Sequence, residues 1–248
     1  MKIVVCISHV PDTAAKVSIG DDGKSIDPKE VSFVVNPYDE YAIEEALKTK
    51  ESLGGEVVAV SVGTEVNKET IRKALAMGVD SGVLLKDDNP RDSLAVAKAL
   101  AEEIKAQEAE LVFFGKQSVD YDNSIVGQMT AELLGYNSVS VAVSFKIEDQ
   151  KITVEREIEG GREVVETTLP AVVTAQKGLN EPRYAALKGI MAAKKKTIEE
   201  KPVAECESFV EVVKMKRPAA KEAGKIIGTD ASAVPELVRL LREEAKVI

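Results

Sequence analysis

The segment "NPYDEYAIEEALKTKESLGGEVVAVSV", residues 36–62, determines the predicted fold. Its first part has a helical pattern, in which Asn36 suits the N-cap and Pro37 suits the first helical position. Ile43, Ala46 and Leu47 then share one face of that helix. The run "VVAV" after the glycine pair is apolar at consecutive positions, as in a strand covered on both faces of a parallel sheet. The segment therefore predicts a helix followed by a buried strand.

The same alternation extends over the rest of the first 177 residues. Apolar runs of strand length lie at 2–8, 56–62, 82–86, 110–115, 138–145 and 170–176. Helical patterns lie between them at 36–55, 67–78, 90–109 and 122–135. Strands that alternate with helices of this length are typical of βαβ units. We expect an α/β protein with a doubly wound, mostly parallel, Rossmann-like sheet.

Two segments have the pattern of β-hairpins. "KVSIGDDGKSI", residues 16–26, is predicted to turn at Asp22-Gly23, and "KITVEREIEGGREVVETTL", residues 151–169, is predicted to turn at Gly160-Gly161. Both are expected to be antiparallel additions to the sheet.

The character of the chain changes after about residue 195. Charge is dense there and periodicity is weak, so this region is not expected to add a layer to the core. Near the end, Ser232 is a candidate cap for a helix whose apolar side chains are Val234, Leu237, Val238 and Leu241. The predicted organisation is a core over 1–177, a projecting segment over 178–199 and a C-terminal arm over 200–248 that packs on a partner.

Composition narrows the class of protein. The 248 residues carry 33 Lys plus Arg against 42 Asp plus Glu, a net charge of −9, which argues against general nucleic-acid binding. Cys6 and Cys206 form no C-x-x-C pair, so neither a disulfide framework nor a metal site is predicted. No apolar run approaches the ~20 residues of a membrane span, and the N-terminal run is too short for a signal peptide. A cytoplasmic protein without direct membrane insertion is expected.

Ligands of open parallel sheets bind beyond the carboxyl ends of the strands. Three loops meet this condition, at 8–12, 36–39 and 115–124. In the third, "GKQSVDYDNS", Gly115 allows a close backbone approach, and the amides of 123–126 would offer a helix N-terminus to a phosphate. The alternative is an ordinary turn in which Asp122 or Asn123 caps the helix. The loop matches neither the Walker pattern nor G-x-G-x-x-G.

Groups for acid, base or nucleophilic catalysis are scarce. His9 is the one histidine, and a lone histidine at a strand end is more often a structural donor than a catalytic base. Cys6 lies within an apolar strand and is expected to pack as a small hydrophobic side chain. These residues favour a binding protein over a hydrolase, and no catalytic residue is assigned.

The stretch "GLNEPRYAALKGIMAAKKKTIE", residues 178–199, allows two interpretations. Asn180-Glu181-Pro182 is predicted to precede a helix, on which Tyr184, Leu187 and Met191 have roughly helical spacing. One interpretation is a surface helix that ends in solvated lysines. The other is an exposed apolar anchor, backed by a basic cluster that would meet an acidic partner.

Several separated motifs resemble the beta subunit family of electron transfer flavoproteins. They are "NPYDEYAIEEAL", "ETIRKALAMG", "GKQSVDYDN", "VEREIEGG" and "LNEPRYA", in the order of that family and over almost the whole chain. The resemblance implies a heterodimer with an alpha subunit that holds most of the FAD. It also implies electron transfer from acyl-CoA dehydrogenases and similar enzymes of fatty acid oxidation to a quinone-linked oxidoreductase. A carrier subunit of this kind is not an enzyme in its own right.

The resemblance also implies roles for particular residues. Residues 178–199 match the family's recognition segment, in which Leu187 would dock into the dehydrogenase with support from Tyr184, Ile190 and Met191. Glu157 matches a carboxylate that pairs with an arginine of the alpha subunit. A structural AMP is implied at Cys6, Asn36, Pro37, Tyr38, Asp39, Val62, Gly115, Lys116, Gln117, Ser118, Val119, Asp120, Asp122, Asn123, Ser124, Ile125 and Val126.

Two alternatives remain open at this point. Electron-bifurcating relatives hold a second FAD in place of AMP, but they typically have glycine where this chain has Tyr121, so AMP is favoured. The loop also departs from the family at "NSIV", and Thr13 stands where some relatives place an aromatic residue near the flavin. The other alternative is a stand-alone adenine-nucleotide-binding protein of similar fold, which would not explain the recognition segment or the arm.

Overall fold

The computed structural model describes residues 1–89, 91–203, 206–220 and 223–248. Pro90, which begins one predicted helical pattern, and residues 204–205 and 221–222 of the predicted arm lie outside the described residues. The chain divides into two compact units, Met1–Val213 and Lys214–Ile248.

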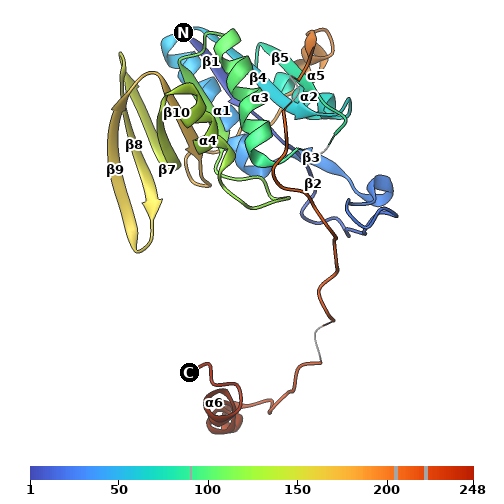
Figure 1. The fold of residues 1–248 in the computed structure, drawn as a ribbon. Helices are drawn as coiled ribbons and strands as arrows, with labels where there is room; N and C mark the ends of the chain where they lie inside the picture. Colours follow the sequence, from blue (N-terminus) through green and yellow to red (C-terminus); the bar gives the residue numbers. More distant parts are fainter. Residues whose placement is uncertain (90, 204–205, 221–222) are drawn as a thin grey trace. The chain divides into compact units, whose positions relative to one another are not determined.

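Unit 1 is built on a nine-stranded sheet of order β11-β5-β4-β1-β6-β10-β7-β8-β9 (Figure 1). Neighbouring strands pair in parallel from β11 to β7, whereas β7–β8 and β8–β9 are antiparallel. The strands are β1 Lys2–Cys6, β4 Glu56–Gly63, β5 Ser81–Lys86, β6 Leu111–Gly115, β7 Asn137–Glu148, β8 Lys151–Ile158, β9 Gly161–Thr168, β10 Ala171–Ala175 and β11 Ile198–Pro202. The predicted doubly wound, mostly parallel sheet is confirmed.

Helices cover both faces of the parallel part of the sheet. α1 (Pro37–Leu53) and α2 (Asn67–Met77) lie on one face, and α3 (Ser93–Ala106) and α4 (Val126–Leu134) lie on the other. In β1, Ile3 and Val5 belong to the core on the α1 side, while Val4 and Cys6 belong to the core on the α3 side. Both faces of the strand are therefore buried, which explains its continuous apolar run.

A small separate sheet pairs β2 (His9–Pro11) with β3 (Phe33–Val35). Between them the chain forms a loop with a short 3-10 turn at Pro28–Glu30. The chain does reverse within the predicted hairpin at 16–26, since an antiparallel bridge joins Ile19 and Ile26, but the segment is not the predicted addition to the sheet. The carboxylate of Asp22 accepts hydrogen bonds from the amides of Lys24 (2.9 Å) and Ser25 (3.0 Å). Such local side-chain bonds compete with strand pairing.

The second predicted hairpin does extend the sheet, as β8 and β9. Ile158 pairs with Gly161, so the two-residue turn is Glu159-Gly160 and lies one residue before the predicted position. Gly160 has a φ of 80°, the left-handed region that glycine adopts without a Cβ clash.

Strand β11 is an element that the sequence pattern after residue 195 does not predict. It is the edge strand of the sheet and pairs in parallel with β5 from Ile198 to Pro202. Its sequence, "IEEKP", is polar because an edge strand has one open side. Lys201 points toward α3, where its Nζ lies 2.8 Å from the buried carboxylate of Glu103.

Unit 2 contains the 3-10 turn η2 (Ala231–Ala233) and helix α6 (Val234–Glu243). The predicted cap at Ser232 is wrong: the N-cap of α6 is Ala233, which forms no side-chain capping bond. Asp230 caps the preceding turn η2, and its carboxylate accepts a hydrogen bond from the amide of Ser232 (2.8 Å). The predicted helix itself is present. Val234, Leu237 and Val238 are exposed on it.

Candidate functional site

The strand-end loops meet where the order of the strands reverses. From β1 the chain crosses through α1 to β4 on one side, whereas β6 pairs with the other side of β1. Ligands of open α/β sheets bind at this kind of switch point. The loop after β1, the start of α1 and the loop after β6 all lie here, as predicted.

Asn36 ties these segments together. It is the N-cap residue of α1, but its side chain forms no capping bond to the helix. Its Nδ2 instead donates to the carbonyl of Gln117 and to Asp39 Oδ1, both at 2.8 Å, and its Oδ1 accepts from the amide of Val119 at 3.2 Å. The buried amide therefore fixes the loop after β6 against the start of α1.

Asp39 is the second member of this buried pair. Its Oδ2 accepts a hydrogen bond from the amide of Ser8 (2.7 Å), and its Oδ1 accepts one from the amide of Gly115 (3.0 Å). Burial raises the pKa of this carboxyl to about 7, against the opposing effect of the bonds from Asn36, Ser8 and Gly115. Asp39 is thus an internal acceptor that joins the ends of β1 and β6.

Gly115 is required at the end of β6 by its own protein neighbours. A Cβ at this position would lie 2.3 Å from Asp39 Oδ1 and 2.7 Å from the carbonyl carbon of Tyr38. Gly115 thus permits a close approach to the first turn of α1, whereas the close approach of a ligand stays a prediction.

The Gly115→Ala variant is expected to lose ~1–3 kcal/mol of unfolding free energy, because a methyl group there must push α1 away from the sheet. Denaturant unfolding of the purified protein measures this loss. Gly161→Ala is the control, since a Cβ on Gly161 meets nothing within 4 Å. Equal stabilities of the two variants would contradict the steric argument.

The loop over 116–125 is held largely by its own side chains. Gln117 Nε2 donates to Asp122 Oδ1 (2.5 Å), and Ser124 Oγ donates to Gln117 Oε1 (2.9 Å). Asn123 Nδ2 donates to Ser93 Oγ at the start of α3 (2.7 Å). Asp122 and Ser124 have φ values of 53° and 52°, so the chain turns twice through the left-handed region.

Helix α4 begins later than predicted. Its N-cap is Ile125, and neither Asp122 nor Asn123 caps it. The first-turn amides are therefore those of Val126, Gly127 and Gln128, whereas 123–125 belong to the loop. Gln128 Oε1 is buried without a hydrogen-bond partner among the described residues. This helix N-terminus combines a positive dipole end with no side-chain cap.

The other residues predicted to contact the nucleotide differ in how far they are exposed. The amine of Lys116 lies 5.0 Å from the centre of the Tyr38 ring. Asp120 accepts a hydrogen bond from the amide of Tyr121, whose side chain is exposed. Pro37 begins α1, Ser118 is half-buried, and Val62 lies half-buried near the end of β4.

Cys6 and His9 both have structural surroundings. Cys6 packs in the core on the α3 side, and burial raises the pKa of its thiol. His9 Nδ1 lies 2.6 Å from Thr70 Oγ1, and its ring stacks on Phe33 with centroids 4.8 Å apart. Burial lowers the pKa of His9. The predicted packing of Cys6 is confirmed. Among the described residues, no group of acidic, histidine or cysteine side chains is arranged to hold a metal.

The segment over residues 178–199 exposes four large apolar side chains. Tyr184 is 98% exposed, Leu187 77%, Met191 56% and Ile190 43%. Single exposed apolar residues are common on protein surfaces, but a group of four within eight residues is not. Its helix, α5 (Leu187–Ala193), begins at Leu187 and not directly after Pro182 as predicted. The segment is thus an exposed apolar projection followed by a short helix.

The basic cluster at 194–196 is smaller than the sequence indicates. Lys194 and Lys195 are exposed, but Lys196 Nζ donates to the carbonyl of Val79. Glu157 on β8 is exposed and accepts a hydrogen bond from Gln176 Nε2 (2.9 Å). Three residues that the sequence pattern does not single out, Ser8, Ser93 and Arg183, form contacts that join segments far apart along the chain.

Fold and site together define a Rossmann-like α/β protein with a projecting apolar segment. The family described as the electron transfer flavoprotein domain matches residues 25–206. The electron transfer flavoprotein subunit beta of Bradyrhizobium diazoefficiens is 42% identical over the full length of both chains. That of Bacillus subtilis is 40% identical over both full lengths, and that of Mus musculus is 39% identical over 96% of each chain. The chain belongs to the electron transfer flavoprotein family and corresponds to its beta subunit.

Among the described residues, no helix has both the length and the apolar character needed to cross a membrane.

Proposed function

We propose that this chain pairs with an alpha subunit to form a heterodimeric electron carrier. The carrier takes electrons from acyl-CoA dehydrogenases and related enzymes and passes them to a quinone-linked oxidoreductase. The observation that carries this proposal is the exposed group Tyr184, Leu187, Ile190 and Met191 on one projecting segment. An exposed apolar cluster of this kind is typical of a protein-docking site.

The proposed dehydrogenase contact is brief and weak, as suits an electron carrier that must exchange partners. Leu187 supplies the apolar anchor, and the exposed amines of Lys188, Lys194 and Lys195 attract an acidic partner surface. FAD, held mainly by the alpha subunit, supplies the one-electron chemistry when it is bound. The residues of this chain bind, orient and dock, and none is proposed as a catalytic acid or base.

We propose AMP as the nucleotide of this chain, held at the strand-end loops. The uncapped N-terminus of α4 suits a phosphate, and Asn36 and Asp39 hold the surrounding loops in place. Gln128 Oε1 offers an acceptor that has no protein donor among the described residues. Tyr121 supports AMP over a second FAD, because a bulky side chain there reduces the room for a larger dinucleotide.

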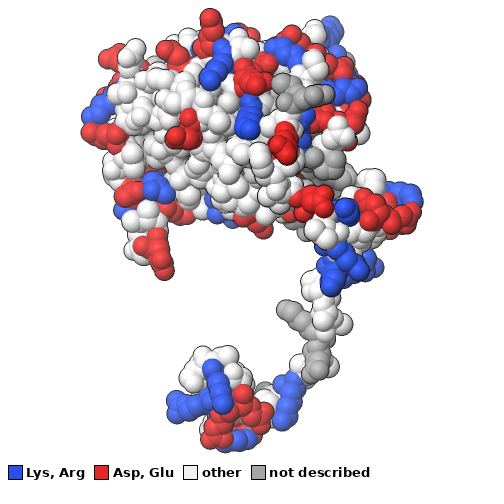
Figure 2. Space-filling model, viewed as in Figure 1, with Lys and Arg blue, Asp and Glu red and all other residues white. Residues whose placement is uncertain are grey.

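The surface of unit 1 supports a protein partner. Lys, Arg, Asp and Glu side chains are interspersed around its margin and over α3, while the part of the drawn face around α4 carries few charges (Figure 2). We propose the alpha subunit as the partner, with Glu157 as one polar contact and the chain after β11 as an arm that embraces it. The exposed apolar residues Phe209, Val210 and Val213 are suited to burial by another chain.

Expression of this chain with and without its alpha subunit tests the proposal. A one-to-one heterodimer whose flavin is reduced by an acyl-CoA dehydrogenase is the expected result. A soluble, self-sufficient chain that binds adenine nucleotide and does not associate with an alpha subunit would contradict it. That outcome would favour the stand-alone nucleotide-binding protein.

A further inference from the structure

The recognition segment is fixed to the core at both of its ends. Leu179, near its beginning, and Ala193, at the end of α5, are buried in the core on the α1 side, with exposed fractions of 9% and 3%. Between these two points the large apolar side chains are exposed. The segment is therefore anchored near both of its ends, while the large apolar side chains between them stay exposed.

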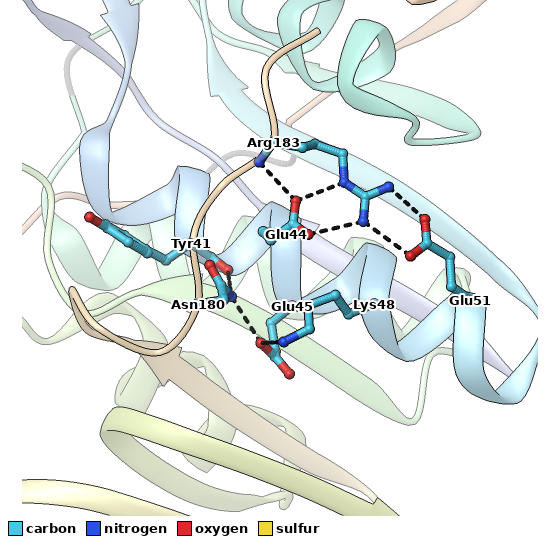
Figure 3. Close-up of polar contacts among 7 residues, drawn as sticks. All are labelled: Tyr41, Glu44, Glu45, Lys48, Glu51, Asn180 and Arg183. Carbon is cyan, nitrogen blue, oxygen red and sulfur yellow. Dashed lines mark hydrogen bonds and ion pairs between the residues drawn. The ribbon is translucent and has the colours of Figure 1, made fainter. Parts of the chain in front are cut away.

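The first anchor is a network between the segment and α1 (Figure 3). The Arg183 guanidinium binds Glu44 through Nε (2.8 Å) and Nη2 (2.9 Å), and it binds Glu51 through Nη1 (2.5 Å) and Nη2 (3.1 Å). The backbone amide of Arg183 also donates to Glu44 (3.0 Å). Asn180 Nδ2 adds bonds to the Tyr41 carbonyl (3.0 Å) and to Glu45 (2.9 Å).

This network differs from an ordinary surface ion pair. The side chain of Glu44 is only 7% exposed and that of Arg183 is 33% exposed. Two-pronged contacts from one guanidinium to two carboxylates fix both the position and the rotation of the arginine. Since the amide of the same residue is bound as well, the contact holds the main chain directly before Tyr184.

The second anchor holds the end of the segment, at α5, against α2. Arg72 Nη1 donates to the carbonyls of Ala193 and Lys196, at 2.7 Å for Ala193. A Cβ on Gly189 would lie 2.3 Å from the carbonyl oxygen of Ala76, so α5 rests directly on the backbone of α2. α5 is too short to be stable by itself, and this packing stabilises it.

We propose that Arg183, through Glu44 and Glu51, is a positioning residue that keeps the recognition segment in its docking shape before any dehydrogenase binds. This inference rests on the proposed docking function of the segment. A pre-organised loop loses less conformational entropy on binding, so the anchor raises affinity without touching the partner. Loss of the Arg183 contacts would raise the KM of the dehydrogenase for the heterodimer and leave kcat unchanged.

The test uses the intact heterodimer with the Arg183→Gln variant. Two quantities are measured: amide hydrogen exchange over 178–199 without dehydrogenase, and KM and kcat for flavin reduction by an acyl-CoA dehydrogenase. If the docking shape falls to about a tenth of the population, exchange accelerates and KM rises about tenfold with kcat unchanged. Arg183→Lys keeps the charge but loses the fork, so it should give an intermediate KM.

Lys151→Gln is the matched control, because it removes one positive charge from an exposed ion pair with Glu166, away from the segment. It should leave both quantities as in the unmodified heterodimer. Glu51→Gln keeps the Glu44 contacts and serves if Arg183→Gln does not fold; a smaller KM increase is expected. Unchanged exchange in Arg183→Gln, or faster exchange with an unchanged KM, would overturn the inference.

Leu187→Ala separates this inference from the docking function. It should raise KM without any change in exchange over 178–186. If Leu187→Ala raises KM while Arg183→Gln changes nothing, the docking function stands and the positioning role of Arg183 is wrong. If neither variant changes KM, the docking function itself is wrong.

Discussion

The Asp39→Ala variant is expected to lose ~3–5 kcal/mol of unfolding free energy and to lose the nucleotide proposed for this chain. Asp39 accepts hydrogen bonds from the amides of Ser8 and Gly115 and from the side chain of Asn36. Alanine would leave these donors without an acceptor in a buried position. Denaturant unfolding and acid release of nucleotide from the purified heterodimer measure the two effects.

Two further variants define what Asp39 does. Asp39→Asn retains the volume and one acceptor oxygen, so a smaller loss of stability is expected than for alanine. Asp21→Ala removes an exposed aspartate from the loop between β2 and β3 and should change stability by no more than ~0.5 kcal/mol. A stable Asp39→Ala heterodimer with full nucleotide content would show that this carboxyl does not organise the site.

The Leu187→Ala variant is expected to lower kcat/KM for reduction by a dehydrogenase by about 10- to 150-fold. This range corresponds to the ~1.5–3 kcal/mol gained when a leucine side chain is buried in an apolar pocket. Leu187 is 77% exposed, so its removal creates no cavity in this chain. Stopped-flow reduction of the flavin at several heterodimer concentrations measures the effect.

The control for this prediction is Leu53→Ala. Leu53 is 47% exposed at the end of α1 and lies outside the recognition segment, so the same chemical change should leave kcat/KM unaltered. Heterodimer formation and nucleotide content should be unchanged in both variants. A Leu187→Ala variant as fast as the Leu53→Ala control would contradict the docking role.

The parallel part of the fold was predictable because each of its central strands is buried on both faces. β1 alternates Ile3 and Val5 toward one core with Val4 and Cys6 toward the other, and this leaves a continuous apolar run in the sequence. β11 leaves no such run. It has one paired side and carries Glu199, Glu200 and Lys201, so its sequence is indistinguishable from a charged loop.

The site was predictable as a set of loops but not as a set of contacts. The strand-end rule identified the segments 36–39 and 115–124. It did not show that Asn36 would leave its own helix uncapped and bind residues 117 and 119 instead. Contacts between positions so far apart in the chain depend on how α1 packs on the sheet. Local sequence patterns do not predict that packing. The same holds for Arg183 and Glu44.

The nucleotide content of the heterodimer is the most direct test of the proposed function. The chain is purified with its alpha subunit, the bound nucleotides are released with acid, and AMP and FAD are separated and quantified. One AMP and one FAD are expected for each heterodimer, with the AMP held by the loops around Asn36, Asp39 and the start of α4. Two FAD and no AMP would contradict this expectation and would identify an electron-bifurcating member of the family.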